Sequence, residues 1–168
     1  IITGCSGAGR TGAARALEDL DWYVVDNLPP AMLPALVGMM SPDGGGVHRL
    51  AVVVDVRSRE FFADFARSLE QLRELGVTYR VFFLEASTDT LVRRYESNRR
   101  PHPLQGDGTL LEGIHAEARA LAPVRRAADV VIDTSGMSVH DLTRHIRDVI
   151  ADAGDVPLRI TVESFGFK

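Results

Sequence analysis

The sequence of 168 residues contains almost no lysine. Its 19 basic residues include a single lysine, Lys168, so the other 18 are arginine. Lysine Schiff-base chemistry, a lysine nucleophile and the usual lysine of a phosphate-binding loop are therefore excluded before that last position. Arginine must supply the positive charge of any such site.

Cysteine is scarce, and an excess of positive charge and long apolar runs are missing. The one cysteine, Cys5, excludes an internal disulfide and a multi-cysteine metal site, and it favours a reducing compartment, the cytoplasm. The 23 acidic residues bring the formal charge to −4, so the chain lacks the basic balance of an obvious nucleic-acid binder. No apolar run approaches about 18 residues, so we expect no membrane span.

Apolar, β-branched runs alternate with segments of helical spacing. The runs cover residues 1–3, 22–25, 50–54, 80–84 and 130–132. Apolar side chains three and four residues apart predict two helices that pack on a sheet, and Ser138 with Asp141 forms a capping-box pattern before the second helix. The alternation predicts an α/β fold, a three-layer domain with a mainly parallel sheet. The two predicted apolar faces consist of Phe61, Phe62, Phe65, Leu69 and Leu72, and of Val139, Leu142, Ile146 and Val149.

The chain is expected to form one main domain over residues 1–156. Its 45% hydrophobic and 25% charged residues are typical of a globular domain with a sizeable core. Residues 1–3 look like the end of a strand, so we expect further residues before them. A new strand-like run follows Pro157, and we interpret residues 157–168 as the start of a second, C-terminal domain.

Residues 4–11 fit the phosphate-loop pattern G-x-x-x-x-G-K-[ST], with arginine in place of lysine. The segment follows a strand and opens a helix, so its backbone N–H groups and the helix dipole favour an anion. Glycine is needed where the backbone approaches phosphate oxygens or takes a positive φ. We predict a P-loop NTPase or kinase-like site in which Thr11 ligates Mg²⁺. The predicted nucleotide-binding residues of this glycine loop are Gly4, Cys5, Ser6, Gly7, Ala8, Gly9, Arg10 and Thr11.

The same stretch carries a second pattern, the dinucleotide fingerprint Gly7-x-Gly9-x-x-Gly12. Asp26 lies nineteen residues after Gly7, where a ribose-binding acid belongs. In that fold, however, the strand runs almost directly into the first glycine, whereas three residues intervene here. A NAD-binding oxidoreductase therefore stays an alternative, behind the phosphate loop.

Four acids follow apolar runs and should lie at the carboxyl edge of the sheet, where open α/β folds bind ligands. Asp55 directly follows the run 50–54 and is the best candidate for Mg²⁺. Asp26 is second, and either acid could orient a nucleophilic water. For Glu85 and Asp133 we favour capping of the following helix.

Four arginines precede an irregular segment that begins at Pro101: Arg93, Arg94, Arg99 and Arg100. They could form a lid that stabilises transition-state charge on a phosphate, or they could end a solvated helix. Both readings stay open, and His102 alone is weak evidence for a site. The predicted catalytic residues are Arg10, Asp26, Asp55, Arg99 and Arg100.

Longer motifs resemble the RapZ/YvcJ family of bacterial P-loop nucleotide-binding proteins, known in enterobacteria as RNase adapter proteins. The most specific are the Asp-Asn-Leu-Pro-Pro run that begins at Asp26 and the Glu-Ser-Phe-Gly-Phe-Lys run that ends at Lys168. The resemblance also includes residues 4–11, 16–20, 55–58, 93–95, 99–104 and 133–140, and so spans the chain.

The resemblance implies binding and hydrolysis of ATP and GTP, and we expect slow turnover with Mg²⁺ that serves as a regulatory switch. It assigns ATP to the glycine loop and GTP to Asp55, Val56, Arg57 and Ser58. An acid at a strand end suits Mg²⁺ better than it suits guanine. Adapter members present small regulatory RNA to a ribonuclease, a role that depends on a C-terminal domain this chain only begins. A homo-oligomer is left open.

Two positions depart from the family pattern. Arg10 replaces the familiar lysine, and its planar fork is larger than an ammonium, so phosphate geometry and turnover should differ. Asp21 stands at a turn where the family usually has glycine.

Overall fold

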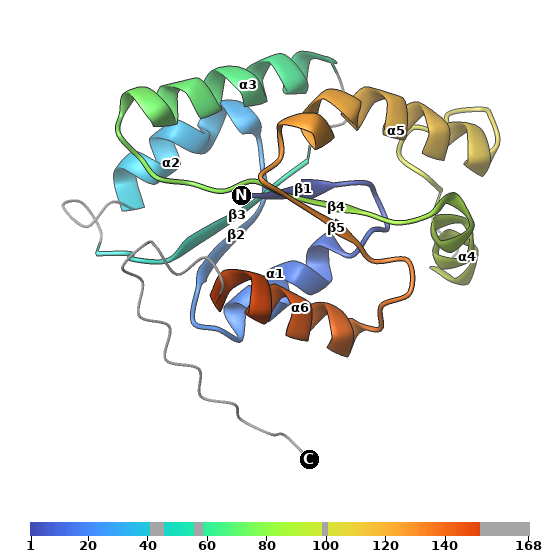
Figure 1. The fold of residues 1–168 in the computed structure, drawn as a ribbon. Coiled ribbons are helices and arrows are strands. Elements are labelled where there is room, and N and C mark those ends of the chain that lie inside the picture. The colour runs from blue at the N-terminus through green and yellow to red at the C-terminus, as the bar shows by residue number, and fades with distance from the viewer. Residues whose placement is uncertain (41–45, 56–58, 99–100, 152–168) are drawn as a thin grey trace.

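In a computed structural model of the chain, the described residues are 1–40, 46–55, 59–98 and 101–151. They form a five-stranded sheet with helices on both faces (Figure 1), which confirms the three-layer α/β fold. The strands are β1 (Ile2–Gly4), β2 (Tyr23–Leu28), β3 (Leu50–Val54), β4 (Phe82–Glu85) and β5 (Val130–Asp133). The helices are α1 (Arg10–Glu18), η1 (Pro30–Met32, a 3-10 turn), α2 (Leu33–Met40), α3 (Arg59–Glu74), α4 (Thr88–Asn98), α5 (Leu110–Ala127) and α6 (Val139–Ala151).

The strand order is β2-β3-β1-β4-β5, and every neighbouring pair is parallel. The central strand is β1, whose Ile2 pairs with Val53 on one side and Phe82 on the other. In the dinucleotide-binding fold the second strand lies directly beside the first. Here β2 is an edge strand beyond β3, so the fold of the NAD-binding alternative does not match.

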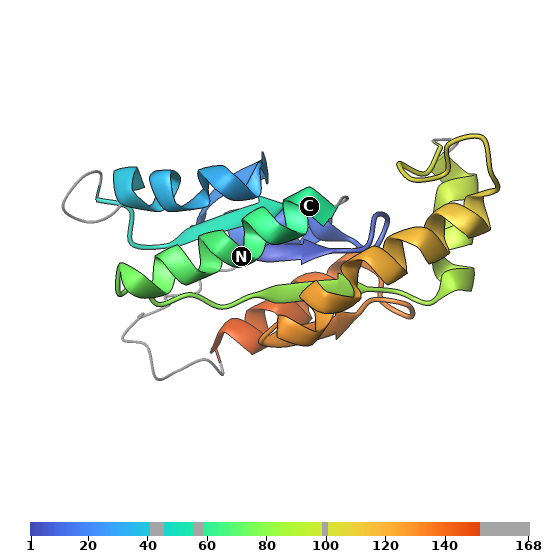
Figure 2. The ribbon, with the colours of Figure 1, turned by 90° about the horizontal axis from the view of Figure 1, so that it is seen from above.

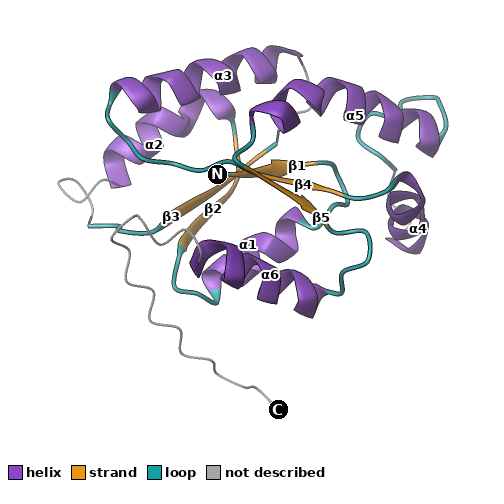
Figure 3. Ribbon diagram, viewed as in Figure 1, coloured by secondary structure: helices purple, strands orange, loops and turns teal. Residues whose placement is uncertain are grey.

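The helices form two layers. Figures 1 and 3 show α1 and α6 on one face of the sheet and α2, α3 and α5 on the other. The view from above in Figure 2 places α4 beyond the carboxyl end of the sheet, next to the start of α5. The loops that leave β1 and β5 meet α4 at this end, through Gly7 and Thr134. No helix in the described part of the chain is long and apolar enough to cross a membrane.

The predicted helix faces supply much of the core, with two exceptions. Phe65, Leu69 and Leu72 of α3 are buried, as are two apolar residues of α6. Phe61 and Val139, however, are 42% and 75% exposed. Each stands in the first turn of its helix, ahead of the part that packs on the sheet, so the prediction that these two belong to the apolar faces was wrong.

Local signals at two helix ends behave as expected. The Oγ of Ser138 accepts the Asp141 N–H at 3.1 Å, and the Asp141 carboxylate accepts the Ser138 N–H at 3.0 Å, which confirms the capping box of α6. Asp21, after α1, has a φ of 69°. That left-handed conformation explains why glycine would suit the position better.

Candidate functional site

The glycine loop, residues 4–11, leaves the central strand β1 and opens α1. Its glycines at 4, 7 and 9 have φ values of 141°, 83° and 98°. A β carbon at Gly4 would lie 2.1 Å from the backbone carbonyl oxygen of Leu84 on β4, far inside contact distance. Glycine is therefore required there both by the conformation and by the neighbouring strand.

Gly12 has a different reason to be glycine. A β carbon there would lie 3.3 Å from the side chain of Leu142, because α1 packs against α6. The third glycine of the apparent dinucleotide fingerprint thus serves helix packing.

The backbone N–H groups of the loop divide into two sets. Cys5 donates to the Leu84 carbonyl and Ala8 to the Cys5 carbonyl, both at 3.0 Å, while Ser6 donates to Glu117 at 2.9 Å. These donors serve the protein itself. Gly9 caps α1 without a side-chain hydrogen bond, and the first N–H groups of a helix have no partner inside that helix. The start of α1 is therefore the part of the loop suited to an anion.

Arg10 and Asp55 meet at the carboxyl edge of the sheet. The Nη1 of Arg10 donates to Oδ1 of Asp55 at 3.0 Å, and the two side chains are only 14% and 16% exposed. They meet because β3, which ends just before Asp55, lies beside β1. Thr11 is exposed at the same helix start. A metal ion at Asp55 would compete with Arg10 for the carboxylate.

This arrangement fits a phosphate and its Mg²⁺. The start of α1 has no side-chain cap, Arg10 brings a positive charge, and Thr11 and Asp55 offer two oxygen ligands. Within the described ranges, no three His, Cys, Asp or Glu side chains cluster as a metal cage. Mg²⁺ commonly takes one or two protein ligands and completes its shell with phosphate and water, so such a cage is not needed.

Arg94 of α4 fastens the glycine loop to the end of β5. Its Nη1 donates to the Gly7 carbonyl at 2.9 Å and to Thr134 Oγ1 at 3.1 Å, and its Nη2 donates to the Thr134 carbonyl at 2.8 Å. Thr134 Oγ1 in turn donates to the Ala8 carbonyl at 2.9 Å. Arg94 is therefore neither an open lid residue nor a solvated helix end. Arg93 donates to Thr90 of its own helix at 3.2 Å.

The capping interpretation of two acids was wrong. Glu85 binds both the Nε and Nη2 of Arg125, at 2.5 and 2.8 Å. Asp133 accepts the hydroxyl and the N–H of Ser135, which lower the pKa of its carboxyl. Serines take over the caps: Ser87 accepts a helix N–H at the start of α4, and Ser138 does so at α6. Glu85 and Asp133 lie further from the helix starts than these serines do, and their carboxylates bind Arg125 and Ser135 instead.

Of the remaining predicted residues, the one that the structure describes, Asp26, is not brought to the loop. Asp26 is exposed on the edge strand β2 and accepts the N–H of Asn27 at 2.7 Å. The strand is irregular between Val25 and Leu28, and Asn27 has a φ of 56°. Val56, Arg57, Ser58, Arg99, Arg100 and residues 157–168 lie outside the described residues.

Sequence reasoning missed a buried polar pair beside the loop. Glu117 of α5 and His102 are 1% and 2% exposed, and their side chains lie 3.0 Å apart. A signal was present, because Glu117 occupies the same helical face as the buried residues Ile114, Leu121 and Val124. An acid in an apolar register indicates a specific partner.

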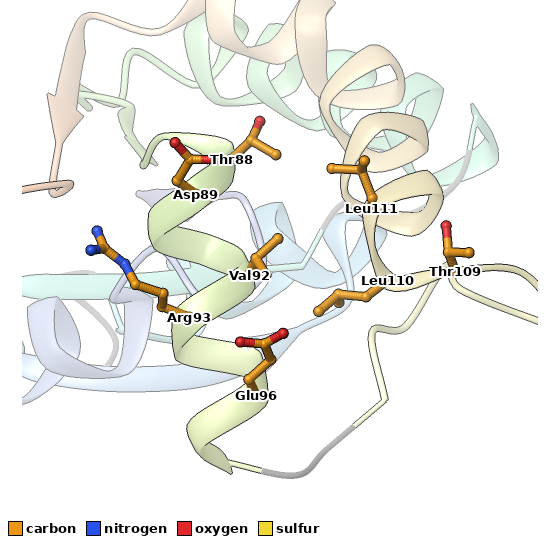
Figure 4. Close-up of a pocket in the computed structure, with 8 residues that line it drawn as sticks. All are labelled: Thr88, Asp89, Val92, Arg93, Glu96, Thr109, Leu110 and Leu111. Carbon is orange, nitrogen blue, oxygen red and sulfur yellow. The ribbon is translucent and has the colours of Figure 1, made fainter.

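A pocket of about 540 Å³ lies between α4 and the start of α5 (Figure 4). On α4 a different set of side chains, Leu91 and Tyr95, faces Gly7. The pocket is thus separate from the glycine loop. Its lining residues are Thr88, Asp89, Val92, Arg93, Glu96, Thr109, Leu110 and Leu111.

Known relatives match the whole chain. A family model described as the RapZ-like N-terminal domain matches residues 1–154. A nucleotide-binding protein of Renibacterium salmoninarum and another of Streptomyces coelicolor are each 55% identical over all 168 residues. The chain spans about half the length of these relatives, 55% and 56% respectively.

Solved structures with the same fold include two shikimate kinases. The enzyme from Acinetobacter baumannii, in complex with shikimate, has a TM-score of 0.60 and 17% identity, covering 92% of this chain and 93% of its own. The enzyme from Bacteroides thetaiotaomicron has a TM-score of 0.57 and 15% identity, covering 89% and 96%. At such identity the likeness establishes a P-loop kinase-like fold and nothing about the substrate.

Proposed function

This chain belongs to the RapZ-like N-terminal domain family, and we propose from that premise that it binds ATP and GTP with Mg²⁺ in the glycine loop and hydrolyses them slowly. The observation that carries the proposal is the junction of β1 and α1. Positive-φ glycines, an open helix start and the Arg10–Asp55 pair converge there on one edge of the sheet. The names of the 55% identical relatives support nucleotide binding.

The residues of this junction have distinct roles in the proposal. Phosphate oxygens accept hydrogen bonds from the first N–H groups of α1 and from the Arg10 guanidinium. Asp55 holds that guanidinium at 3.0 Å before a ligand arrives, which reduces the ordering needed on binding. Thr11 and Asp55 are the proposed Mg²⁺ ligands, and the ion supplies charge neutralisation of the phosphates when bound.

Several finer assignments remain part of the proposal. Arg99 and Arg100 follow α4 and are proposed as lid residues, and the segment 55–58 is proposed to contribute to GTP binding. A water oriented by Asp55 is favoured over one oriented by Asp26, since Asp26 is on the edge strand. Slow turnover suits a cytoplasmic switch.

The direct test is the affinity of the variants Thr11→Ala and Asp55→Ala for Mg-ATP and Mg-GTP, measured by calorimetry beside phosphate release. Each variant removes one oxygen ligand, and we expect affinity to fall about tenfold or more, as for other hydrogen bonds and contacts to charged groups. Arg67→Ala is the control, because Arg67 forms an exposed pair with Asp64 on α3. Unchanged affinity in both site variants would remove this assignment.

An RNA adapter role is a second proposal, and it concerns a protein of the full length that the relatives have. Its support is that the chain spans only about half the length of its relatives, together with the proposed start of another domain at residues 157–168. We expect a protein extended beyond Lys168 to bind small regulatory RNA more tightly than this chain does. Equal RNA affinities in a filter-binding assay would contradict the need for the second domain.

A further inference from the structure

The buried carboxylate of Glu117, on α5, hydrogen-bonds to Ser6 of the glycine loop. The Oε1 of Glu117 accepts the Ser6 hydroxyl at 2.6 Å, and its Oε2 accepts the Ser6 N–H at 2.9 Å. The same Oε2 lies 3.0 Å from Nε2 of His102. Burial of a carboxylate is costly unless donors satisfy it, and these three contacts do so. Ser6 is thereby fixed through both its backbone and its side chain.

The hydrogen bonds of its two ring nitrogens fix His102 in one tautomer. The Leu104 N–H donates to Nδ1 at 3.1 Å, so Nδ1 is an acceptor. The ring proton then stands on Nε2 and is donated to Glu117. The ring also lies against Tyr95, with centroids 5.1 Å apart. A histidine so placed is a specific donor to the carboxylate.

The backbone around His102 is built to admit this ring. A β carbon at Gly113 of α5 would lie 3.0 Å from Nδ1 of His102 and 3.0 Å from the backbone of Gln105. The segment 101–109 between α4 and α5 also bonds to itself, since Gln105 accepts the His102 N–H at 3.3 Å and donates to the Gly108 carbonyl at 3.1 Å. His102 therefore anchors an internally bonded segment beneath the glycine loop.

Stability alone does not explain an acid at position 117. Apolar side chains in place of Glu117 and of its side-chain partners would match the buried face that Ile114, Leu121 and Val124 form on α5, without the desolvation cost of a carboxylate. Only a carboxylate offers two acceptor oxygens, one for the N–H and one for the hydroxyl of Ser6. With those donors committed, and with the Ala8 N–H bound to the Cys5 carbonyl, the N–H groups at the start of α1, up to Thr11, are the ones presented to a phosphate.

We propose that Glu117 is a positioning residue of the phosphate loop, and that through His102 it couples the segment 101–109 to nucleotide binding. The inference rests on the proposed function of the glycine loop. Coupling of this kind is reciprocal. Loss of the His102 anchor weakens nucleotide binding, and bound nucleotide changes the protection of the segment against hydrogen exchange.

The test compares Glu117→Gln, His102→Ala and His102→Gln for Mg-ATP and Mg-GTP affinity, well below each variant's melting temperature. We expect the first two to lose about tenfold or more. His102→Gln should stay within about threefold of wild type, because its amide N–H can take the place of Nε2–H. Glu70→Gln is the matched control, since Glu70 forms an exposed pair with Arg73.

Hydrogen exchange supplies a readout that a purely structural role would not change. Saturating Mg-ATP should alter exchange of the Leu104 and Gln105 amides in wild type and in Glu70→Gln, but not in Glu117→Gln. In the nucleotide-free protein, the Ser6 amide should exchange faster in Glu117→Gln than in wild type.

The possible outcomes distinguish a failure of the positioning role of Glu117 from a failure of the proposed nucleotide binding. If wild type binds nucleotide and Glu117→Gln and His102→Ala bind as tightly, with only their melting temperatures lowered, the positioning role is overturned while the nucleotide site stands. Unchanged exchange of the Ser6 amide overturns it without reference to any ligand. If wild type binds neither nucleotide, the proposed function and this inference both fail.

Discussion

Arg10 stands where a phosphate loop usually has lysine, in a chain whose only lysine is Lys168. Its 3.0 Å contact with Asp55 leaves a charged, planar fork at the start of α1. The missing lysine is thus a substitution at this position, and the site keeps its positive charge.

Arg10→Ala should therefore weaken Mg-ATP and Mg-GTP affinity by about tenfold or more, because it removes a charge-assisted donor. Arg10→Lys should lose much less if charge alone matters. Calorimetric titration of both variants makes the comparison. Equal losses would mean that the site uses the guanidinium shape, and an unchanged affinity of Arg10→Ala would exclude Arg10 from the phosphates.

Cys5 gives a prediction for alkaline pH. Burial, with the nearby Glu117 carboxylate as a second cause, raises the pKa of its thiol from an ordinary value of 9.0 to about 12. As pH rises, the unfolded thiol ionises first, so between these values the unfolded state binds fewer protons than the folded state. The free energy of unfolding should then fall as pH rises above 9.

Urea unfolding at pH values on either side of that onset, in wild type and Cys5→Ala, isolates this effect from other titrating groups. We expect the alkaline loss of stability to be smaller in Cys5→Ala. The same pH dependence in both proteins would contradict a buried, neutral thiol.

At the scale of elements, the turn from β1 into the glycine loop depends on Gly4. Gly4→Ala would bring a β carbon to 2.1 Å from the Leu84 carbonyl, at a φ of 141°. Since β1 and β4 cannot move apart without breaking their pairing, we expect a loss of several kcal/mol, about 3 or more, or no folded protein. Unfolding curves measure it.

Gly38→Ala in α2 is the matched control. A β carbon there meets nothing within 4 Å, and alanine favours a helix over glycine by about 1 kcal/mol. It should be neutral or stabilising. If Gly4→Ala were as stable as Gly38→Ala, the close approach of the two strands would be wrong.

Local elements could be predicted from the sequence because their signals are local. The run 50–54, the Ser138–Asp141 capping box and the strand-loop-helix setting of the glycine loop each depend on neighbours along the chain. The contacts that hold the glycine loop in place join residues that are far apart along the chain. Ser6 and Glu117 are 111 positions apart, Gly7 and Arg94 are 87 apart, and Ala8 and Thr134 are 126 apart. Spacing in the sequence carries no signal for such pairs.

At the scale of the whole molecule, the strand order distinguishes the phosphate-loop interpretation from the dinucleotide-binding interpretation, which the glycine pattern alone left open. The motif from Gly7 to Gly12 fits a dinucleotide fold, yet β1 lies between β3 and β4 while β2 is at the edge. Strand order depends on how the helical crossovers pass over the sheet, which no short motif encodes. The same order brings Asp55 to Arg10 and leaves Asp26 away from the loop.

The most direct test of a phosphate site in the glycine loop is the melting temperature of the protein with Mg-ATP, Mg-GTP and NAD added separately. A ligand that binds only the folded state raises the melting temperature. We predict an increase with Mg-ATP and Mg-GTP, none with NAD, and loss of the increase in Thr11→Ala. Stabilisation by NAD alone would contradict the phosphate loop.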